Sequence, residues 1–212
     1  KFTYGLSEIN RENIKKSNFI ANPGCYPTSI LIPIIPLLKE KNLKIDDFIV
    51  DSKSGVSGAG KRAVTQNLFS ELSDNFFAYG IEEHKHYPEI KQEINSINKN
   101  ITITFIPHLL PVISGIQSTI YFEKKKKLSE YKQVLKDYYK NDYFIKILKN
   151  SDIPTLNNVK NTNYLHMNVF SDQSQKRIVI VSCIDNLIKG AAGQAIQNMN
   201  LMFGFNEKES LI

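Results

Sequence analysis

The sequence predicts an α+β fold, in which helices pack against a mixed β-sheet. Segments with strand-like alternation and segments with helical spacing of apolar residues follow one another irregularly, which is typical of a layered α+β domain. Hydrophobic residues make up 42% and charged residues 23% of the 212 residues, which is enough for a core of ordinary size. The sequence has no internal repeat, so we expect a layered domain and not a repeat protein.

Six segments have the apolar run or the apolar–polar alternation of a β-strand. The clearest is residues 101–105, where apolar side chains alternate with threonine. The others are residues 18–21, 48–53, 115–122, 165–170 and 177–183. The strand at 48–53 leads into a loop of small residues, 54–60.

Four segments have the apolar spacing of helices. They are residues 28–41, a helix opened by Pro88, residues 128–138 and residues 191–203. Pro33 and Pro36 lie inside the first of them, where an interior proline costs roughly 3 kcal/mol, so we expect a kink or a late start. Gly204 is expected to end the last helix, because glycine commonly terminates helices.

Charge and composition limit the kinds of molecule that the protein is expected to bind. The net charge is +6, and its densest lysine run, residues 124–127, follows a strand-like segment and is interpreted as a solvated turn. No nucleic-acid-binding signature is present, no apolar run approaches the ~18 residues of a membrane span, and no signal-peptide pattern is found. We therefore expect no nucleic-acid or membrane partner and a cytoplasmic location. Cys25 and Cys183 lie far apart, which indicates free thiols and no metal site.

Cys25 is the first candidate for chemistry. It lies in the segment Asn-Pro-Gly-Cys-Tyr-Pro-Thr, between a predicted strand and a predicted helix. The positive end of a helix favours a thiolate, and the N–H groups there could face a developing oxyanion. The alternative is a buried cysteine that acts as a small apolar residue.

Three histidines could take part in such chemistry. His84 and His86 lie in Glu-His-Lys-His-Tyr-Pro-Glu, where either imidazole could serve as the base for a cysteine. A metal site is the weaker interpretation because no third ligand lies nearby, and two surface histidines are the remaining alternative. His108 ends a predicted strand between two prolines and could be either structural or a ligand.

The loop at residues 54–62 resembles a phosphate-binding loop. It matches seven positions of G-x-x-x-x-G-K-[ST], but Arg62 replaces the hydroxyl residue, so we reject an ATPase. Small residues that expose backbone N–H groups, followed by two cations, could still hold a phosphate or a carboxylate. The alternative is a flexible loop with a basic end.

Together these segments resemble the N-acetyl-gamma-glutamyl-phosphate reductases of arginine biosynthesis. The matching stretches occur in the family's order and span nearly the whole chain. They are residues 4–11, 22–28, 54–61, 84–90, 107–115 and 185–204. The matches at 22–28 and at 54–61, Ser-Gly-Val-Ser-Gly-Ala-Gly-Lys, are highly specific.

The resemblance implies a chemical role for each site residue. Cys25 would attack the acyl phosphate to give a thioester, and NADPH would reduce the thioester to N-acetylglutamate semialdehyde. His84 would be the acid/base residue, and Asn186 would contact the nicotinamide end of the NADP cofactor. The residues that would contact the acyl-phosphate substrate are Ser54, Gly55, Ser57, Lys61, His86 and His108.

The resemblance also implies a fold and a domain organisation. The fold would be that of the glyceraldehyde-phosphate dehydrogenase catalytic domain, with a largely antiparallel sheet, in a homo-oligomer (dimer or tetramer). Residues 1–24 would be the tail end of the NAD(P)-binding domain, 25–185 the catalytic domain, and 186–212 a C-terminal helix returning to the NAD(P)-binding domain.

Most of that NAD(P)-binding domain would lie outside this chain, because the sequence lacks a G-x-G-x-x-G turn. We therefore expect the chain alone to be inactive. We also expect it to expose apolar residues of its last helix, namely Ile196, Met199, Leu201 and Phe203.

Two alternatives stay open. One is a related reductase that acts on an amino-adipyl or aspartyl phosphate with the same cysteine and histidine. The other is a catalytically silent domain that serves oligomer assembly. One departure bears on specificity, because Ser114 stands where the family usually has arginine.

Overall fold

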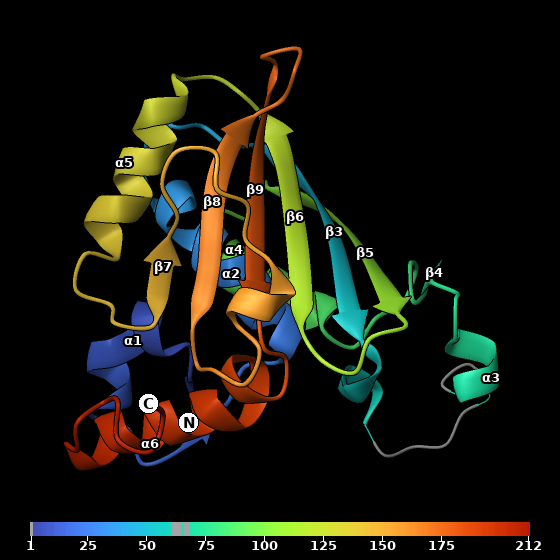
Figure 1. The fold of residues 1–212 in the computed structure, drawn as a ribbon. Helices are drawn as coiled ribbons and strands as arrows, with labels where there is room; N and C mark the ends of the chain where they lie inside the picture. The colour runs from blue at the N-terminus through green and yellow to red at the C-terminus, as the bar shows by residue number, and fades with distance from the viewer. Residues whose placement is uncertain (1, 61–64, 66–67) are drawn as a thin grey trace.

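A seven-stranded mixed sheet forms the centre of the fold (Figure 1). The computed structural model describes residues 2–60, 65 and 68–212. The strand order is β4-β5-β3-β6-β9-β8-β7; β3 pairs in parallel with β5 and β7 with β8, and the other four pairings are antiparallel. The strands are β3 (Asp47–Gly55), β4 (Phe77–Ala78), β5 (Thr102–Leu110), β6 (Ile116–Glu123), β7 (Ile145–Ile147), β8 (Leu165–Ser171) and β9 (Arg177–Ile184). The expected α+β class with a largely antiparallel mixed sheet is confirmed.

Helices cover one face of this sheet and one of its ends. In Figure 1, α2 and α4 lie behind the sheet, α5 lies beside them, and α1 and α6 lie together below it. The helices are α1 (Ser7–Ile14), α2 (Cys25–Lys39), α3 (Phe69–Leu72), α4 (Tyr87–Asn95), α5 (Leu128–Tyr138) and α6 (Gly193–Phe203). Two short strands, β1 (Thr3–Tyr4) and β2 (Ile20–Ala21), pair in parallel next to α1. None of the described helices is long and apolar enough to cross a membrane.

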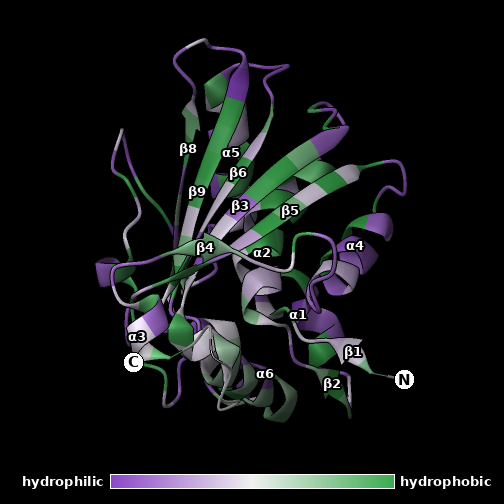
Figure 2. Ribbon diagram, turned by 90° about the vertical axis from the view of Figure 1, so that its right-hand side faces the viewer, coloured by the Kyte–Doolittle hydropathy of each residue, from purple (hydrophilic) through white to green (hydrophobic). Residues whose placement is uncertain are grey.

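Alternation along the strands sorts side chains between the two faces of the sheet. In β3, Phe48, Val50 and Ser52 are buried, and the residues between them are partly or fully exposed. Figure 2 shows the same alternation as bands of green and paler colour along the strands. The buried face packs against α2, where the Ser29 hydroxyl lies 2.7 Å from that of Ser118 in β6. This contact helps to fix α2, and with it residue 25, on the sheet.

Helix α2 runs through both of its prolines. The expected late start is wrong, because the helix begins at residue 25, three residues before the predicted start at 28. Pro36 cannot donate a hydrogen bond to the carbonyl four residues earlier, that of Ile32. The buried Tyr139 hydroxyl donates to this carbonyl instead, at 2.5 Å. A side chain from beyond α5 therefore supplies the bond that proline removes.

The Tyr139→Phe variant should lower the free energy of unfolding by about 1–3 kcal/mol, the cost of leaving a buried carbonyl without a partner. Chemical denaturation of the full-length protein measures this loss. Tyr121→Phe serves as the control, because Tyr121 is half-buried in β6 and no hydrogen bond of its hydroxyl is described. Equal stability of Tyr139→Phe and wild type would show that the Ile32 carbonyl finds another donor.

The C-terminal helix α6 buries a polar side and exposes an apolar one. Gln194, Gln197 and Asn198 are buried against α1, whereas Met199 is 44% and Phe203 68% exposed. The expected exposure holds for these two residues and in part for Ile196, which is half-buried, but is wrong for Leu201, which is buried. The predicted helix start at 191 is also corrected, because a π-helical turn, η4 (Ile188–Ala192), precedes α6.

Candidate active site

Cys25 is the first residue of α2 and is held from both sides. Gly24 is the N-cap, and its N–H donates to Oε1 of Glu89 at 2.9 Å. The same oxygen accepts from the Tyr4 hydroxyl at 2.7 Å. On the other side, a Cβ added at Gly190 would lie 2.6 Å from the Cβ of Cys25. The position of the thiol therefore depends on segments from both ends of the chain.

The electrostatic environment of Cys25 differs from the sequence expectation of a favoured thiolate. Burial raises the pKa of the Cys25 thiol above its ordinary value. The N–H groups of Tyr26 and of Cys25 itself oppose this increase, as does the charge of Lys85, while Glu89 adds to it. The helix N-terminus acts as expected, but desolvation outweighs it.

Cys25 should nevertheless be alkylated near pH 7 much faster than Cys183. Cys183 is fully buried, and burial raises the pKa of its thiol to about 12. Cys25 is only partly buried, and backbone N–H groups stabilise its thiolate. Peptide mass spectrometry after brief alkylation of the folded protein measures both rates. Preferential labelling of Cys183 would overturn the assignment of the reactive thiol.

His84 lies in a cage of aromatic rings. Its ring centroid is 5.5 Å from those of Tyr26 and Tyr79 and 5.3 Å from that of Phe105. Burial, and then the charge of Lys85, lowers the pKa of His84, so the imidazole is neutral at pH 7. Its Nδ1 accepts a 3.2 Å hydrogen bond from the backbone N–H of His86, which places the proton of the neutral ring on Nε2.

His86 packs against the residue before the cysteine. A Cβ at Gly24 would lie 2.5 Å from Nε2 of His86, so the absence of a side chain makes room for the imidazole. Burial lowers the pKa of His86 to about 4, and the charge that His84 carries when protonated and the charge of Lys85 act in the same direction. The ring centroids of the two histidines lie 5.2 Å apart. The structure thus brings Cys25, His84 and His86 to one place, although no described hydrogen bond joins the thiol to either imidazole.

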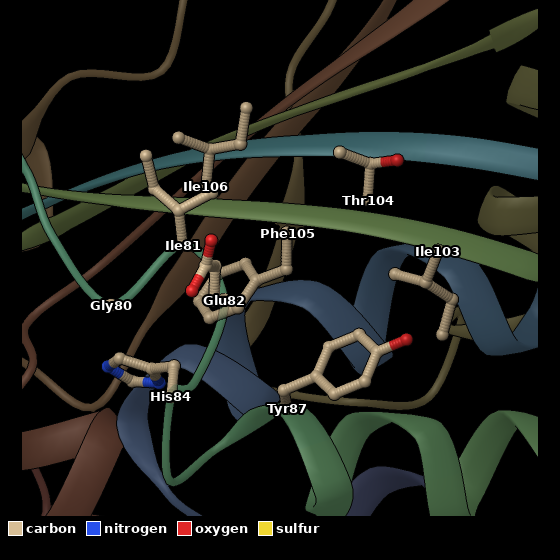
Figure 3. Close-up of a pocket in the computed structure, with 9 residues that line it drawn as sticks. All are labelled: Gly80, Ile81, Glu82, His84, Tyr87, Ile103, Thr104, Phe105 and Ile106. Atoms are coloured by element: carbon tan, nitrogen blue, oxygen red, sulfur yellow. The ribbon is translucent and has the colours of Figure 1, made fainter.

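Two cavities meet at His84. One has a volume of about 300 Å³ and is lined by Gly80, His84, Tyr87 and Phe105, with neighbours shown in Figure 3. The other, of about 270 Å³, is lined by Gly58, Tyr79, His84 and Lys85 among others. The second cavity connects the small-residue loop after β3 with the histidine segment. Cys25 is not among the residues that line either cavity, so the second cavity is a candidate substrate pocket through His84 and the loop alone.

The loop after β3 is not the open phosphate cradle that the sequence indicated. The N–H groups of Gly55, Val56 and Ser57 donate to the carbonyls of residues 115, 112 and 113 at 2.9, 2.9 and 3.0 Å. A side chain at position 55 would also collide with that backbone, at 2.8 Å from the Ser114 nitrogen. The segment 112–115 therefore takes three of the N–H groups that the sequence suggested for an anion, those of residues 55–57. Lys61, the cation predicted for this role, lies outside the described residues.

The remaining loop residues still border the site. The Ser54 side chain is buried, and its Oγ lies 2.9 Å from where a Gly58 side chain would begin. Ser57 is half-buried, and its hydroxyl accepts a 3.0 Å bond from Nδ2 of Asn186. The serines thus shape the loop, and a side chain at position 58 would require the Ser54 hydroxyl to move.

Asn186 connects two loops. Its Oδ1 accepts from the N–H of Gly115 at 2.5 Å, in addition to the bond that its Nδ2 donates to Ser57. The side chain is buried, and one hydrogen of Nδ2 stays available for a further partner. In this structure the Asn186 side chain holds together the loop that contains Ser57 and the loop that contains Gly115.

The side chain of His108 points away from α2, the helix that begins at Cys25. Its Nδ1 is 3.1 Å from Oδ1 of Asp51, on the sheet face opposite to α2. Only its backbone carbonyl reaches the site, where it accepts from the Tyr26 hydroxyl at 3.2 Å. The expectation that the His108 side chain contacts substrate is therefore not supported by its placement, because strand alternation directs the side chain away.

Sequence analysis missed Glu89, Tyr79 and Gly190. Glu89 lies three residues after His86 and ends the segment that contains both histidines, so its position there was a usable signal. Tyr79 and Gly190 reach the site through tertiary packing, and no local pattern indicates them.

The site brings together a cysteine at a helix start and two histidines, on a fold with a mixed sheet. Residues 25–186 match the family described as semialdehyde dehydrogenase, dimerisation domain, and the chain belongs to this family.

The curated relatives carry the name that the sequence resemblance gave. The chain is 47% identical, over 99% of its length, to the probable chloroplastic N-acetyl-gamma-glutamyl-phosphate reductase of Arabidopsis thaliana, of which it covers 53%. It is 47% identical to the N-acetyl-gamma-glutamyl-phosphate reductase of Lachnoclostridium phytofermentans over 98% of the chain and 61% of that protein. The resemblance is thus confirmed, and the chain spans about half to three-fifths of these relatives' length.

Solved structures share the fold. Aspartate semialdehyde dehydrogenase II of Vibrio cholerae, complexed with ASA, has a TM-score of 0.75 at 21% identity, and the match covers 96% of this chain and 68% of that one. The Candida albicans aspartate semialdehyde dehydrogenase with NADP has a TM-score of 0.65 at 17% identity, over 93% of this chain and 64% of that one.

Proposed function

We propose that the protein containing this chain reduces N-acetyl-gamma-glutamyl phosphate to N-acetylglutamate 5-semialdehyde and phosphate, in arginine biosynthesis. The observation that carries the proposal is the placement of Cys25 at the start of α2, with two histidines packed beside it. The names of the curated relatives supply the substrate.

Cys25 acts as the nucleophile. Its sulfur attacks the acyl carbonyl carbon, a C–S bond forms, and the bond to the phosphate oxygen breaks with its electron pair on phosphate. The product is a thioester. The N–H groups at the start of α2, which already stabilise the thiolate, are suited to the oxyanion that develops during attack. Burial raises the thiol pKa, so a base is needed to remove the proton.

His84 is the group that removes and returns this proton. Its depressed pKa keeps the ring neutral and able to accept a proton at pH 7. Acceptance at Nε2 requires the tautomer protonated on Nδ1, which loses the bond from the His86 N–H. That bond is long, at 3.2 Å, and its loss costs only about 0.5–1.5 kcal/mol. His86, neutral and packed on Gly24, orients the substrate beside the thiol.

The cofactor of the proposed reaction is NADPH, which when bound supplies the hydride that converts the thioester to the aldehyde. The free hydrogen of Nδ2 makes Asn186 the one residue we assign to it, at the nicotinamide end. The sequence has no G-x-G-x-x-G motif, the glycine turn that binds a pyrophosphate at a helix start. We propose that the remaining contacts come from a part of the protein that this chain does not span.

The isolated chain should bind NADPH only near the millimolar range, roughly −4 kcal/mol, because one or two hydrogen bonds contribute about 0.5–1.5 kcal/mol each. Isothermal titration calorimetry of the chain, with the full-length protein as the control, measures this affinity. Micromolar binding to the chain alone would reveal a cofactor site among its own residues.

The substrate is tested by the reverse reaction. Phosphate-dependent oxidation of N-acetylglutamate semialdehyde by the full-length protein should exceed the oxidation of aspartate or amino-adipate semialdehyde in kcat/KM. A preference for either of the others would assign the chain to a related acyl-phosphate reductase, and absence of all three activities would favour a silent assembly domain.

The domain organisation and assembly are proposed on separate grounds. The exposed apolar side of α6, with Met199 and Phe203, is suited to pack on an NAD(P)-binding domain. Residues 1–24 and 186–212 would then belong to the NAD(P)-binding domain, and residues 25–185 would form the catalytic domain that binds the substrate. The matched family's description as a dimerisation domain supports a homo-oligomer. Light scattering of the full-length protein tests the oligomeric state.

A further inference from the structure

The π-helical turn η4 lies between Cys25 and a buried ion pair. The N–H of Gly190 donates to the carbonyl of Asp185 at 2.9 Å, and that of Ala192 to the carbonyl of Leu187 at 3.0 Å, which is the i→i+5 pattern. The Asp185 carboxylate also accepts from the N–H of Ile188, at 3.1 Å. Such turns are rare and occur frequently at functional sites.

One side of this turn contacts the nucleophile. Gly190 approaches Cys25 so closely that a Cβ there would lie 2.6 Å from the Cβ and 3.1 Å from the Cα of the cysteine. Next to this contact, the Asn22 side chain donates to the carbonyl of Ala191 at 3.2 Å. The turn therefore packs against the Cβ and Cα of Cys25 and is bonded to the segment that precedes the cysteine.

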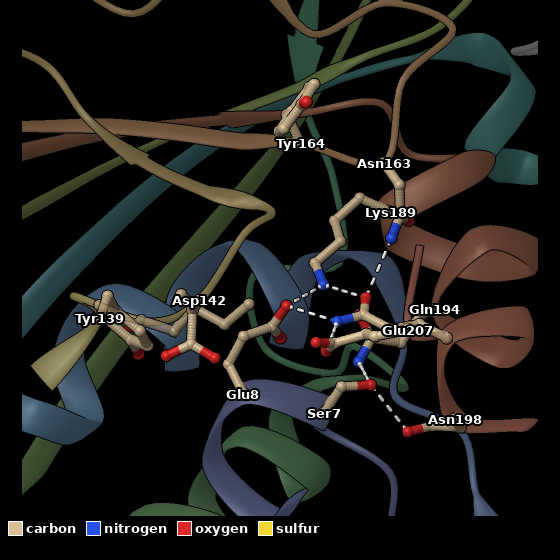
Figure 4. Close-up of polar contacts among 12 residues, drawn as sticks. Ser7, Glu8, Tyr139, Asp142, Asn163, Tyr164, Lys189, Gln194, Asn198 and Glu207 are labelled. Atoms are coloured by element: carbon tan, nitrogen blue, oxygen red, sulfur yellow. Dashed lines mark hydrogen bonds and ion pairs between the residues drawn. The ribbon is translucent and has the colours of Figure 1, made fainter. Parts of the chain in front are cut away.

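The other side of the turn is anchored by Lys189, the residue before Gly190. Its side chain is fully buried, and Nζ donates to Oε1 of Glu8 at 2.6 Å and to Oε1 of Gln197 at 2.8 Å. Gln197 in turn donates to the same Glu8 oxygen at 2.9 Å. Figure 4 shows Lys189 reaching from the C-terminal segment to Glu8 of α1, with Gln194 and Ser7 bonded nearby.

A need for stability does not explain this arrangement. Well-packed apolar residues in place of a buried ion pair commonly leave a protein equally or more stable. A buried pair with three directional hydrogen bonds instead sets one geometry, since the ammonium and the amide must satisfy their acceptors in fixed directions. The element whose geometry it sets is the turn that lies on Cys25.

We propose that Lys189 is a positioning residue for the nucleophile, whose bonds to Glu8 and Gln197 hold the η4 turn so that Gly190 covers Cys25 and fixes the direction of its thiol. The effect on the reduction rests on the proposed function. The effect on the thiol does not, because alkylation needs neither substrate nor cofactor.

The Lys189→Met variant of the full-length protein tests this. Alkylation of Cys25 by iodoacetamide at pH 7 should become about tenfold faster, equivalent to about 1.4 kcal/mol, because the covering turn moves away. Alkylation of Cys183, which lies buried on the sheet, should not change and reports global opening. The kcat for acyl-phosphate reduction should fall while KM stays near that of wild type.

Glu8→Leu combined with Lys189→Met separates positioning from stability. This double variant has no unpaired buried charge, so it should regain the thermal stability of wild type. The alkylation of Cys25 should nevertheless remain faster than in wild type. Lys53→Met is the control with the same substitution. It breaks the ion pair of Lys53 with Asp51, at 2.8 Å, which shares no partner with Lys189, and it should leave the alkylation rate of Cys25 unchanged.

Three results would overturn the proposal. The first is an unchanged alkylation rate of Cys25 in Lys189→Met, and the second is an equal increase in the alkylation rates of Cys25 and Cys183. The third is a double variant that recovers both the stability and the Cys25 alkylation rate of wild type. If Cys25 responds as expected but the wild-type protein reduces no acyl phosphate, the positioning role stands and the proposed function fails.

Discussion

Replacing Cys25 by alanine in the full-length protein should abolish acyl-phosphate reduction, with a loss of about 10⁶-fold in kcat, as for other enzymes that lose a covalent nucleophile. The fold should be kept, because the alanine Cβ still packs against Gly190 and the helix N-cap at Gly24 is unchanged. A coupled assay that follows NADPH oxidation measures the loss, and thermal melting checks the fold.

Cys183→Ala is the matched control for this experiment. Cys183 is the other cysteine of the chain, and its sulfur accepts only a weak 3.6 Å contact from Gln117. Its loss should leave kcat near that of wild type. Residual activity of Cys25→Ala within a hundredfold of wild type would show that reduction does not pass through a Cys25 thioester.

The second large effect is expected at His84. His84→Ala should lower kcat by ~10²–10⁴-fold, the usual contribution of a positioned acid/base group. Thioester formation should become slow and should not disappear, because Cys25 stays in place. His84→Asn makes the test sharper, since its amide oxygen can accept the His86 N–H in place of Nδ1 while no group can accept the thiol proton.

His86→Ala distinguishes the roles of the two histidines. His86 packs on Gly24 and has a pKa of about 4, so its loss should raise KM more than it lowers kcat. Near-wild-type turnover of His84→Ala together with an inactive His86→Ala would reverse the two assignments.

Local sequence patterns were sufficient to predict an element where its structure depends on residues close together in the chain. The segment around Cys25 predicted a strand-to-helix junction, and the structure has one, with Gly24 as N-cap. The helix opened by Pro88 occurs as α4, with Ile90 and Ile94 buried. Alternating apolar residues likewise located the long strands, because burial of one sheet face imposes that period.

Long-range pairing explains what the sequence could not show. The N–H groups of residues 55–57 look free in the sequence, but the distant segment 112–115 takes them. Pro36 predicted a defect in α2, and Tyr139 from beyond α5 compensates for it. No local sequence pattern marks Lys189 as buried, and the π turn directs it to Glu8. In each case the partner is fixed by the tertiary fold and not by local spacing.

The central claim is that Cys25 forms a thioester with N-acetyl-gamma-glutamyl phosphate. The most direct measurement is intact-protein and peptide mass spectrometry of the full-length protein mixed with this acyl phosphate in the absence of reduced cofactor. The account predicts one N-acetylglutamyl group per chain on the peptide that contains Cys25, released when NADPH is added, and no adduct in Cys25→Ala. An unmodified Cys25 in a protein that turns over the same substrate, or an adduct that persists in Cys25→Ala, would contradict it.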